Sequence, residues 1–270
     1  MKKLGVVGHP IAHSKSPAIQ LNFAAQCNVA IEYEKYNVAP LEFRQFIKTF
    51  FDEGGHGLNI TVPFKEIAFE LSTPANQRVS QAKAVNTLYL DSQGKLVGNN
   101  TDGPGFVKDL ENNSIALKDK SVLLLGAGGA VRGILPSLID KQCGPITVAN
   151  RTLENASKLR QEFLDYYPIE VCSFENVPVR PFDLIINGTS MGLTGETPLI
   201  SPAVIGENTA CYDLMYSSSP TAFIKWCLEN NAKKAVDGLG MLVEQAAESF
   251  NIWMAETPET QKVIAEMKSQ

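Results

Sequence analysis

An apolar stretch broken by glycines constrains the fold of this chain more than any other feature of its sequence. A run of aliphatic residues at 122–125 leads directly into the turn Gly-Ala-Gly-Gly-Ala at 126–130, and a mainly apolar stretch then continues to Ile139. The stretch from Val122 to Ile139 is nearly long enough to cross a bilayer, but Arg132 lies near its centre and five glycines or prolines interrupt it. A buried strand, a tight turn and a helix therefore explain it better than a membrane span.

Short apolar runs alternate with helical patterns along all 270 residues, which is typical of an α/β fold. We expect strands at residues 4–7, 58–62, 85–90, 95–97, 121–125, 146–149, 183–187 and 210–214. The pattern changes near Asp102, where a helical segment and a polar connector precede the glycine turn. The sequence thus predicts two α/β domains separated by a cleft, one of residues 1–101 completed by helices in 238–270, the other of residues 102–237.

Composition excludes several classes of partner. The net charge of −5 and the isoelectric point near 5.4 argue against a nucleic acid or an anionic membrane as partner. The five cysteines are scattered and form no Cys-x-x-Cys pair, which predicts reduced thiols in a cytoplasmic protein and no zinc site. His9 and His13 are separated by Pro10, which argues against a helix that would present both to a metal.

The turn at 126–130 has the composition of a dinucleotide-binding turn. Small residues let the backbone approach a pyrophosphate, and the start of the next helix presents N–H donors. A purely structural turn would also use glycine, but the position between a strand and a helix favours a cofactor site. Val131 stands where a third small residue is usual, so we expect looser packing of helix on strand. The candidate cofactor residues in the turn are Gly126, Ala127, Gly128, Gly129 and Ala130.

The residues after the next strand indicate which nicotinamide cofactor is bound. An NAD enzyme usually carries Asp or Glu here, to bind the ribose 2′-hydroxyl. This chain has Asn150, Arg151 and Thr152, with no carboxylate before Glu154. A guanidinium can bind a 2′-phosphate with two parallel hydrogen bonds, so the sequence favours NADP over NAD. Thr152 is also expected to cap the helix that follows.

The last long helix, expected at residues 239–255, has two distinct faces. Its core stripe consists of Leu242, Val243, Ala246, Ala247, Phe250 and Trp253. A rotation of about 100° per residue places Gly238, Met241, Gln245 and Ser249 on a separate flank. That flank either faces a ligand or is a partly exposed side of the helix, and spacing alone does not distinguish the two.

Two helix starts carry further candidates. Ser16 and Pro17 are expected as the N-cap and first residue of one helix. Pro63 is expected as the first residue of a short helix, which places Lys65 in its first turn. A cation there faces the positive end of the helix dipole, whereas the nearby carboxylate of Asp102 favours the charge. Such opposed effects suit a group that exchanges a proton, although a lone lysine is more often a solvated surface residue.

Several motifs together resemble the shikimate dehydrogenase family, in order and at the spacing of that family, from residue 5 to about residue 255. They are residues 14–17 (Ser-Lys-Ser-Pro), 59–65 (Asn-Ile-Thr-Val-Pro-Phe-Lys), 84–87 (Ala-Val-Asn-Thr), 98–103 (Gly-Asn-Asn-Thr-Asp-Gly), the two cofactor motifs, 187–192 (Asn-Gly-Thr-Ser-Met-Gly) and 238–245 (Gly-Leu-Gly-Met-Leu-Val-Glu-Gln). The resemblance implies an N-terminal substrate domain, a Rossmann-like NADP-binding domain, and a cytoplasmic monomer or homodimer. It also implies reversible reduction of 3-dehydroshikimate to shikimate by NADPH, in aromatic amino-acid biosynthesis.

The resemblance also implies roles for individual residues. Ser14 and Ser16 would hold the substrate carboxylate, with Tyr216 near it. Ring hydroxyls would be bound by Thr61, Asn86 and Gln245. Lys65 and Asp102 would be the catalytic pair and also contact the substrate. Further cofactor contacts would come from Thr189, Leu214, Gly238 and Met241. Leu214 stands where the family usually has methionine and Met215 follows it, so either could face the nicotinamide.

Three alternative readings remain. A quinate/shikimate dehydrogenase that uses NAD is disfavoured by Ser14, Ser16 and Arg151. A folate-type methylene dehydrogenase shares the two-domain plan and a lysine, but residues 100–102 and 238–245 disfavour it. An NADP-binding redox sensor on the same fold would have no reason to keep Lys65 with Asp102.

Overall fold

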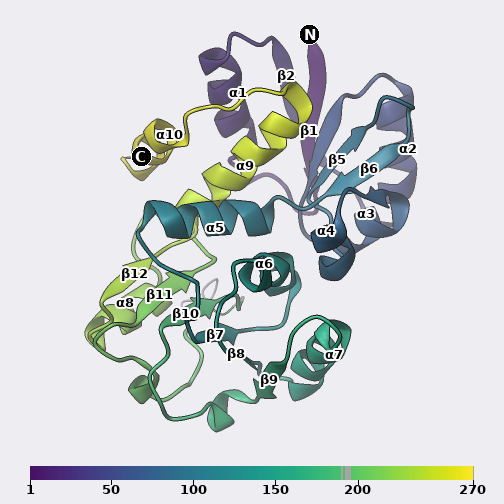
Figure 1. The fold of residues 1–270 in the computed structure, drawn as a ribbon. Helices are drawn as coiled ribbons and strands as arrows, with labels where there is room; N and C mark the ends of the chain where they lie inside the picture. Colours follow the sequence, from purple (N-terminus) through teal and green to yellow (C-terminus); the bar gives the residue numbers. More distant parts are fainter. Residues whose placement is uncertain (190, 192–195, 270) are drawn as a thin grey trace. The chain divides into compact units, whose positions relative to one another are not determined.

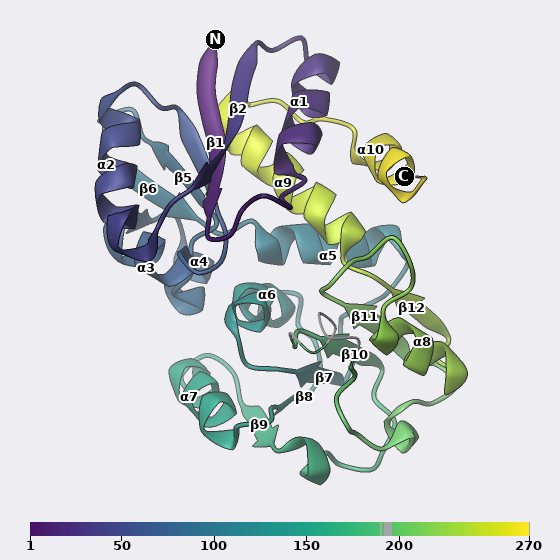
Figure 2. The same ribbon diagram turned by 180° about the vertical axis from the view of Figure 1, so that it is seen from behind.

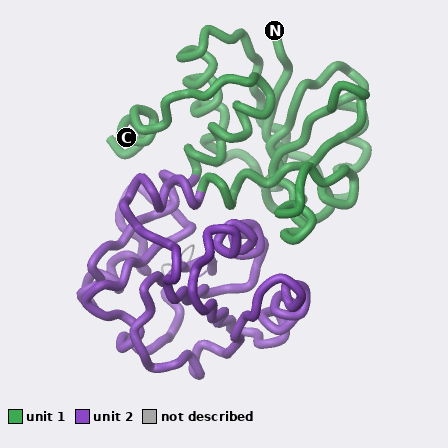
Figure 3. The backbone as a smooth tube through the Cα atoms, in the orientation of Figure 1, with its two compact units in different colours: residues 1–105, 242–270 green, residues 106–241 purple. Residues whose placement is uncertain are grey.

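The computed structural model describes residues 1–189, 191 and 196–269, which form two compact units (Figure 3). Unit 1 consists of residues 1–105 and 242–270, and unit 2 of residues 106–241. Both divisions fall four residues later than expected from the sequence, at 105 instead of 101 and at 241 instead of 237. The shift arises because each crossing runs through a helix, Asp102–Asn112 (α5) or Leu239–Met254 (α9), and not through a loop.

Unit 1 is a mixed sheet with helices on both faces (Figure 1). Its strand order is β2-β1-β3-β5-β6-β4, in which β3 pairs antiparallel with β5 and β5 antiparallel with β6. The strands are Lys2–Gly8 (β1), Ile31–Asn37 (β2), Gly57–Ile60 (β3), Thr73–Pro74 (β4), Thr87–Leu90 (β5) and Leu96–Asn99 (β6). The helices, besides α9 and the first turn of α5, are Ser16–Gln26 (α1), Phe43–Asp52 (α2), Lys65–Leu71 (α3), Gln77–Ala82 (α4) and Thr260–Lys268 (α10).

Alternation along β1 distributes its side chains between two separate cores of unit 1. Leu4 and Val6 pack with apolar residues of α1, α9 and α10 on one face. Val7 packs with residues of α2 and α3 on the other. Both faces of the central strands are thus buried, as the apolar run at 4–7 predicts. Figure 2 shows α1 and α9 on the same side of β1.

Unit 2 is a parallel, doubly wound sheet with the strand order β12-β11-β10-β7-β8-β9. The strands are Val122–Leu125 (β7), Ile146–Ala149 (β8), Ile169–Cys172 (β9), Leu184–Asn187 (β10), Ala210–Asp213 (β11) and Lys234–Val236 (β12). The helices are most of α5, Gly129–Asp140 (α6), Leu153–Phe163 (α7) and Ala222–Glu229 (α8). Residues of α5, α6 and α7 pack on one face of the sheet, and residues of α8 on the other.

The apolar stretch 122–139 is a strand, a turn and a helix, as the sequence predicts. Strand β7 lies at the centre of the sheet, where the strand order reverses direction, and α6 begins at Gly129. Ligands of such sheets bind beyond the carboxyl ends of the strands at this reversal. Among the described residues, none of the helices is both long enough and apolar enough to span a bilayer.

Two expected helix starts were placed wrongly. Helix α1 begins at Ser16, with Lys15 at the N-cap position and no side-chain cap, so Ser16 is not the cap. Instead the hydroxyl oxygen of Ser14 accepts a hydrogen bond from the backbone N–H of Ser16 at 3.3 Å. Pro63 precedes α3, which begins at Lys65 itself. The local residue types indicated a helix start in both cases, but not which residue would satisfy the free N–H groups.

Candidate functional site

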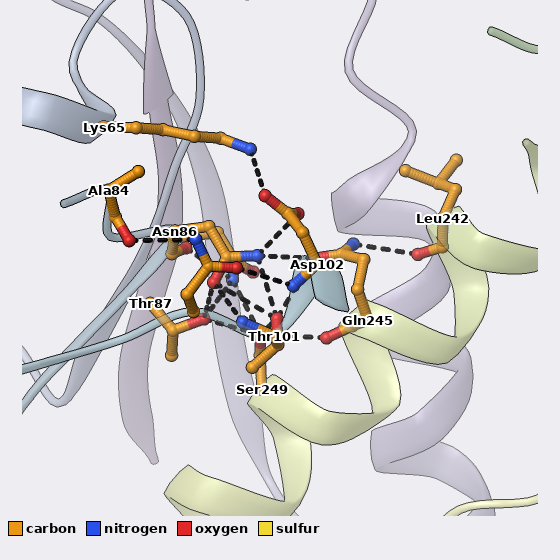
Figure 4. Close-up of polar contacts among 11 residues, drawn as sticks. Lys65, Ala84, Asn86, Thr87, Thr101, Asp102, Leu242, Gln245 and Ser249 are labelled. Atoms are coloured by element: carbon orange, nitrogen blue, oxygen red, sulfur yellow. Dashed lines mark hydrogen bonds and ion pairs between the residues drawn. The ribbon is translucent and has the colours of Figure 1, made fainter. Parts of the chain in front are cut away.

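Lys65 and Asp102 form an ion pair within unit 1. The ammonium nitrogen lies 2.6 Å from Oδ2 of Asp102, and both side chains are largely buried, with 22% and 9% of their surfaces exposed (Figure 4). Lys65 is the first residue of α3, which follows β3, and Asp102 is the first residue of α5, which follows β6. The fold thus brings together two charged groups 37 residues apart, beyond the ends of two strands that flank β5 in the sheet.

The carboxylate of Asp102 is held from more than one side. Its second oxygen, Oδ1, accepts a hydrogen bond from the Asn86 amide at 2.9 Å. The backbone N–H of Asp102 donates to Oδ1 of Asn100 at 3.0 Å, while the Asn100 amide donates to the carbonyl of Ala84 at 2.9 Å. One carboxylate oxygen is therefore held by an amide while the other receives the lysine, an arrangement of charge-assisted bonds that defines the ammonium position.

Asn86 is the centre of a buried cluster of polar side chains. Its Oδ1 accepts from the backbone N–H of Thr101 at 2.8 Å, which fixes the amide orientation because a backbone N–H can only donate. Its Nδ2 then faces Asp102, the Thr101 hydroxyl at 2.9 Å and Oε1 of Gln245 at 3.2 Å. Gln245 approaches because Gly105 has no side chain, since a Cβ there would lie 2.5 Å from the Gln245 backbone nitrogen.

The remaining substrate candidates lie in different places. Ser14 and Ser16 are joined at the start of α1. Burial raises the pKa of Tyr33 well above its ordinary value, and a hydrogen bond from the Ser16 side chain opposes this effect. Thr61 directly follows β3, and its methyl group lies close to Gly8. Tyr216 belongs to unit 2, beyond β11, where burial raises the pKa of its hydroxyl and keeps it a hydrogen-bond donor.

Unit 2 has a cavity of about 300 Å³ at the carboxyl ends of β7, β8 and β10. Its lining comprises Gly126, Ala127, Gly128, Asn150, Arg151, Asn155, Phe174, Gly188, Thr189 and Met191. Six of these were expected from the sequence, namely Gly126, Ala127, Gly128, Asn150, Arg151 and Thr189. The other expected cofactor residues, Gly129, Ala130, Thr152, Leu214, Gly238 and Met241, are not part of the lining.

The sequence interpretation missed four of the lining residues. Asn155 lies in the first turn of α7, three residues after Thr152, so its position next to the predicted 2′-phosphate site could have been noticed. Gly188 and Met191 belong to the motif at 187–192, of which residues 190 and 192 lie outside the described part. Phe174 lies in the 3-10 helix at Phe174–Asn176, which follows β9, and no local sequence signal marks it as a cavity residue.

The glycine turn has the geometry that a pyrophosphate requires. Gly126 has φ = +105°, which side-chain-bearing residues rarely adopt, and a Cβ there would lie 3.0 Å from the carbonyl oxygen of Gly188. No atom lies within 4 Å of a Cβ built on Gly128 or Gly129, so their backbone faces open space. Helix α6 begins there and presents its free N–H groups, so this chain fits a dinucleotide.

Val131 fits in its place because the neighbouring loop has a glycine, Gly188, with no side chain. It is fully buried, and a Cβ built on Gly188 would lie 2.4 Å from its methyl carbon. Glycine at 188 therefore makes the space that the larger residue at 131 occupies. Leu214 lies close to the same place, 3.2 Å from a Cβ at Gly188.

The loop after β8 is organised by its own backbone and amide. The Asn150 side chain donates to the carbonyl of Thr152 at 2.8 Å. Thr152 occupies the N-cap position of α7, as expected, but its side chain makes no capping bond. Arg151 is exposed beside the cavity, where its guanidinium can reach a phosphate.

A buried carboxylate orders the loops beyond β10 and β11. Asp213 accepts hydrogen bonds from the Thr221 hydroxyl at 2.6 Å, the Asn187 amide at 3.1 Å and the backbone N–H of Met215 at 3.1 Å. Oδ1 of Asn187 in turn accepts from the backbone and hydroxyl of Thr189 at 3.2 and 2.8 Å. Thr189 is therefore fixed where it lines the cavity.

Comparison with known proteins identifies the family. The chain matches the sequence models of the shikimate dehydrogenase substrate binding domain at residues 6–88, shikimate/quinate 5-dehydrogenase at 109–205 and the shikimate 5'-dehydrogenase C-terminal domain at 238–268. A shikimate dehydrogenase (NADP(+)) from Marinobacter nauticus is 50% identical over 98% of this chain and 97% of its own length. The chain belongs to the shikimate dehydrogenase family.

Other relatives and solved structures agree with this membership. The shikimate dehydrogenase (NADP(+)) from Alkalilimnicola ehrlichii is 47% identical, with 99% of each chain covered. The enzyme named Ael1 from Pseudomonas putida superposes with a TM-score of 0.92 at 38% identity, covering 98% of both chains. The shikimate 5-dehydrogenase from Thermus thermophilus, solved with NADP(H) and shikimate, superposes with a TM-score of 0.87 at 29% identity, covering 100% of this chain and 99% of that one.

Proposed function

We propose that this chain catalyses the reversible reduction of 3-dehydroshikimate to shikimate by NADPH, a step of aromatic amino-acid biosynthesis. The observation that carries the proposal is the buried contact of Lys65 with Asp102 at 2.6 Å, in a chain that is 50% identical to a relative named for this activity. A cofactor site alone would fit many reductases, whereas the charged pair supplies the group that must handle a proton.

The proposed substrate residues of unit 1 offer donors and acceptors of the kind that shikimate needs. Ser14 and Ser16, at the start of α1, bind the carboxylate, which the positive end of a helix also favours. Asn86 and Gln245, in contact with each other, bind ring hydroxyls, as does Thr61. Tyr216 binds the carboxylate as well, because its hydroxyl remains a donor.

The proposed chemistry is a proton transfer by Lys65. Bound NADPH supplies a hydride to the carbonyl carbon of the substrate. Negative charge then develops on the carbonyl oxygen, and the Lys65 ammonium donates a proton to it or stabilises it as a cation. Asp102 orients the ammonium and holds its charge. In the reverse direction, neutral Lys65 takes the proton of the hydroxyl.

We propose that unit 2 holds NADP and unit 1 the substrate. The turn of Gly126, Ala127, Gly128, Gly129 and Ala130 would hold the pyrophosphate. Arg151, together with Asn150 and Thr152, would bind the adenosine 2′-phosphate. Thr189, Leu214, Gly238 and Met241 would contact the nicotinamide end. Support comes from the cavity whose lining includes both the turn and Arg151.

The proposal extends to the setting of the enzyme. Its five cysteines are free thiols, so we propose a cytoplasmic location, and its net charge of −5 supports the absence of a nucleic-acid partner. As the family resemblance implies, we also propose a monomer or homodimer. Sedimentation of the purified chain with and without added duplex DNA tests its oligomeric state and its lack of DNA binding.

A steady-state assay tests the function. Shikimate and quinate are each offered with NADP and with NAD, and reduced cofactor is followed by its absorbance. The proposal expects the highest kcat/KM for shikimate with NADP. A preference for quinate with NAD would favour the quinate enzyme, and no turnover of any pair would overturn the proposed activity.

A further inference from the structure

The hydroxyl of Ser249 lies inside unit 1, fully buried, at the meeting point of four chain segments. Its oxygen is 3.0 Å from the Asn59 amide nitrogen, 2.8 Å from the Thr87 hydroxyl and 3.2 Å from the Thr101 hydroxyl. It is also 3.1 Å from the carbonyl oxygen of Gln245 on its own helix. The flank of α9 that carries Gln245 and Ser249 is thus not solvated at Ser249 (Figure 4).

The hydrogen bonds of this cluster can be assigned in one consistent direction. Oδ1 of Asn86 carries no hydrogen and lies 2.9 Å from the Thr87 hydroxyl, so Thr87 must donate to it. Thr87 then accepts from Ser249 at 2.8 Å, and the Ser249 hydrogen is shared between this bond and the Gln245 carbonyl oxygen at 3.1 Å. Ser249 keeps two lone pairs, which accept from the Asn59 amide and the Thr101 hydroxyl. Each of these buried polar groups then has a partner.

The series of hydrogen bonds continues in the same direction at both ends. At one end the Tyr33 hydroxyl, in a side chain that is 6% exposed, donates to Oδ1 of Asn59 at 2.7 Å. At the other end the Asn86 amide donates to Asp102. In this assignment every bond from Tyr33 to the Asp102 carboxylate donates toward the charge, and bonds so aligned polarise and strengthen one another in a buried environment.

We propose that Ser249 is a positioning residue, which fixes the Asp102 carboxylate through Asn86 as the central link of this one-way chain. The proposal rests on the proposed function, in which Asp102 orients the lysine. Neither Ser249 nor Tyr33 reaches the ion pair directly, so both act by holding Asn86. Without the Ser249 hydroxyl, Thr87 keeps only the longer bond from the Asn59 amide at 3.3 Å, and that amide loses an acceptor. Asn86 then keeps its bond from the Thr101 backbone N–H but is held less firmly toward Asp102.

The test is the variant Ser249→Ala, assayed for shikimate oxidation at saturating NADP. We expect kcat to fall about tenfold, the effect of one buried hydrogen bond, while the KM for NADP does not change. Ser249→Cys, with a weak donor of similar size, should recover part of the loss. Tyr33→Phe removes only the first donor and should also lower kcat. It therefore tests the series of hydrogen bonds even if Ser249→Ala does not fold.

Measuring the effect of Ser249→Ala in a variant that lacks Lys65 distinguishes a positioning role from a purely structural role. In a Lys65→Ala background, Ser249→Ala should change the residual kcat by less than about twofold, because Ser249 acts through the ion pair. Ser137→Ala, a buried serine of α6 outside the chain of hydrogen bonds, is the matched control and should leave kcat unchanged. The inference is overturned if Ser249→Ala keeps kcat within about twofold of the unchanged enzyme, or loses as much in the Lys65→Ala background.

A crystal structure of Ser249→Ala gives a second result that does not depend on the reaction. Displacement of the Asn86 amide from Asp102 supports the inference, and an unchanged contact overturns it. Failure of the unchanged enzyme to oxidise shikimate would overturn the proposed function instead, and the crystal structure would still decide the role of Ser249.

Discussion

The Lys65 ammonium lies 2.6 Å from Asp102, and the two residues are the first residues of two helices, α3 and α5. Each position follows the end of a strand of unit 1, so the rigid sheet sets the distance between the charges. The Asn86 amide occupies the other carboxylate oxygen, which leaves the carboxylate little freedom to rotate. The pair is therefore held in place before any substrate binds.

The first prediction concerns this pair. Lys65→Ala and Asp102→Ala should each lower kcat, by about 10² to 10⁴-fold if the lysine acts as a full acid–base catalyst. Because the residues act as a unit, the double variant should be little worse than the more damaged single variant. The control is Lys48→Ala, which removes the exposed ion pair with Asp52 on α2 and should leave kcat unchanged. Near-normal kcat with a raised KM for shikimate would show that Lys65 only binds substrate.

The second prediction concerns selection of the cofactor. Arg151 is the basic residue beside the cavity at the end of β8, where an acidic residue would favour NAD. Arg151→Ala should raise the KM for NADP much more than the KM for NAD, because only NADP carries the 2′-phosphate. Arg160→Ala, which changes an exposed arginine on α7 outside the cavity lining, should affect neither. Equal, small changes with both cofactors would contradict the assignment.

The third prediction separates two glycines of the same turn. Gly126→Ala places a side chain at φ = +105° and 3.0 Å from the Gly188 carbonyl, so it should lower the melting temperature as well as NADP binding. Gly128 has φ = −87° and open space around its Cβ position. Gly128→Ala should therefore leave the melting temperature unchanged and raise only the KM for NADP. Thermal unfolding with and without NADP checks both, and equal destabilisation by the two variants would argue against this account.

The fourth prediction concerns pH and Asp183, the residue before the interior strand β10 of unit 2. Burial alone would raise the pKa of Asp183, but hydrogen bonds from Ser121 and Lys120 outweigh it and lower the pKa from its ordinary value of 3.8. The bonds from the Ser121 hydroxyl and backbone measure 2.7 and 2.9 Å, and that from Lys120 measures 3.0 Å. A lowered pKa means that ionised Asp183 stabilises the fold above pH 3.8 and that this contribution is lost as the pH falls through the lowered value.

Urea unfolding of Asp183→Asn measures this contribution. The variant should be less stable than the unchanged chain at pH 7, and the difference should narrow as the pH falls below 3.8. Asp165→Asn, an exposed carboxylate beyond α7, is the control and should show no such pH dependence. A stability difference that stays constant with pH would mean that the ionised form of Asp183 contributes nothing.

The sequence alone determined those features that neighbouring residues encode. The strand, turn and helix at 122–139 follow from a short aliphatic run and from a glycine at position 126, where the backbone has φ = +105°. The last long helix was expected at 239–255 and is observed at Leu239–Met254, because its apolar stripe repeats with the helical period. Motif order then indicated the family, and the position of Arg151 after a strand indicated NADP.

Only the tertiary structure decided which side chains meet. Ser14, not Ser16, accepts the free N–H at the start of α1, and Phe174 lines the cavity without any local signal. The contacts of Ser249 with Asn59 and Thr87 span 190 and 162 residues, so the helical period could place Ser249 on a flank but not name its partners. Such contacts depend on strand order and on helix packing, which arise from burial of the whole core, and no stretch of neighbouring residues encodes them.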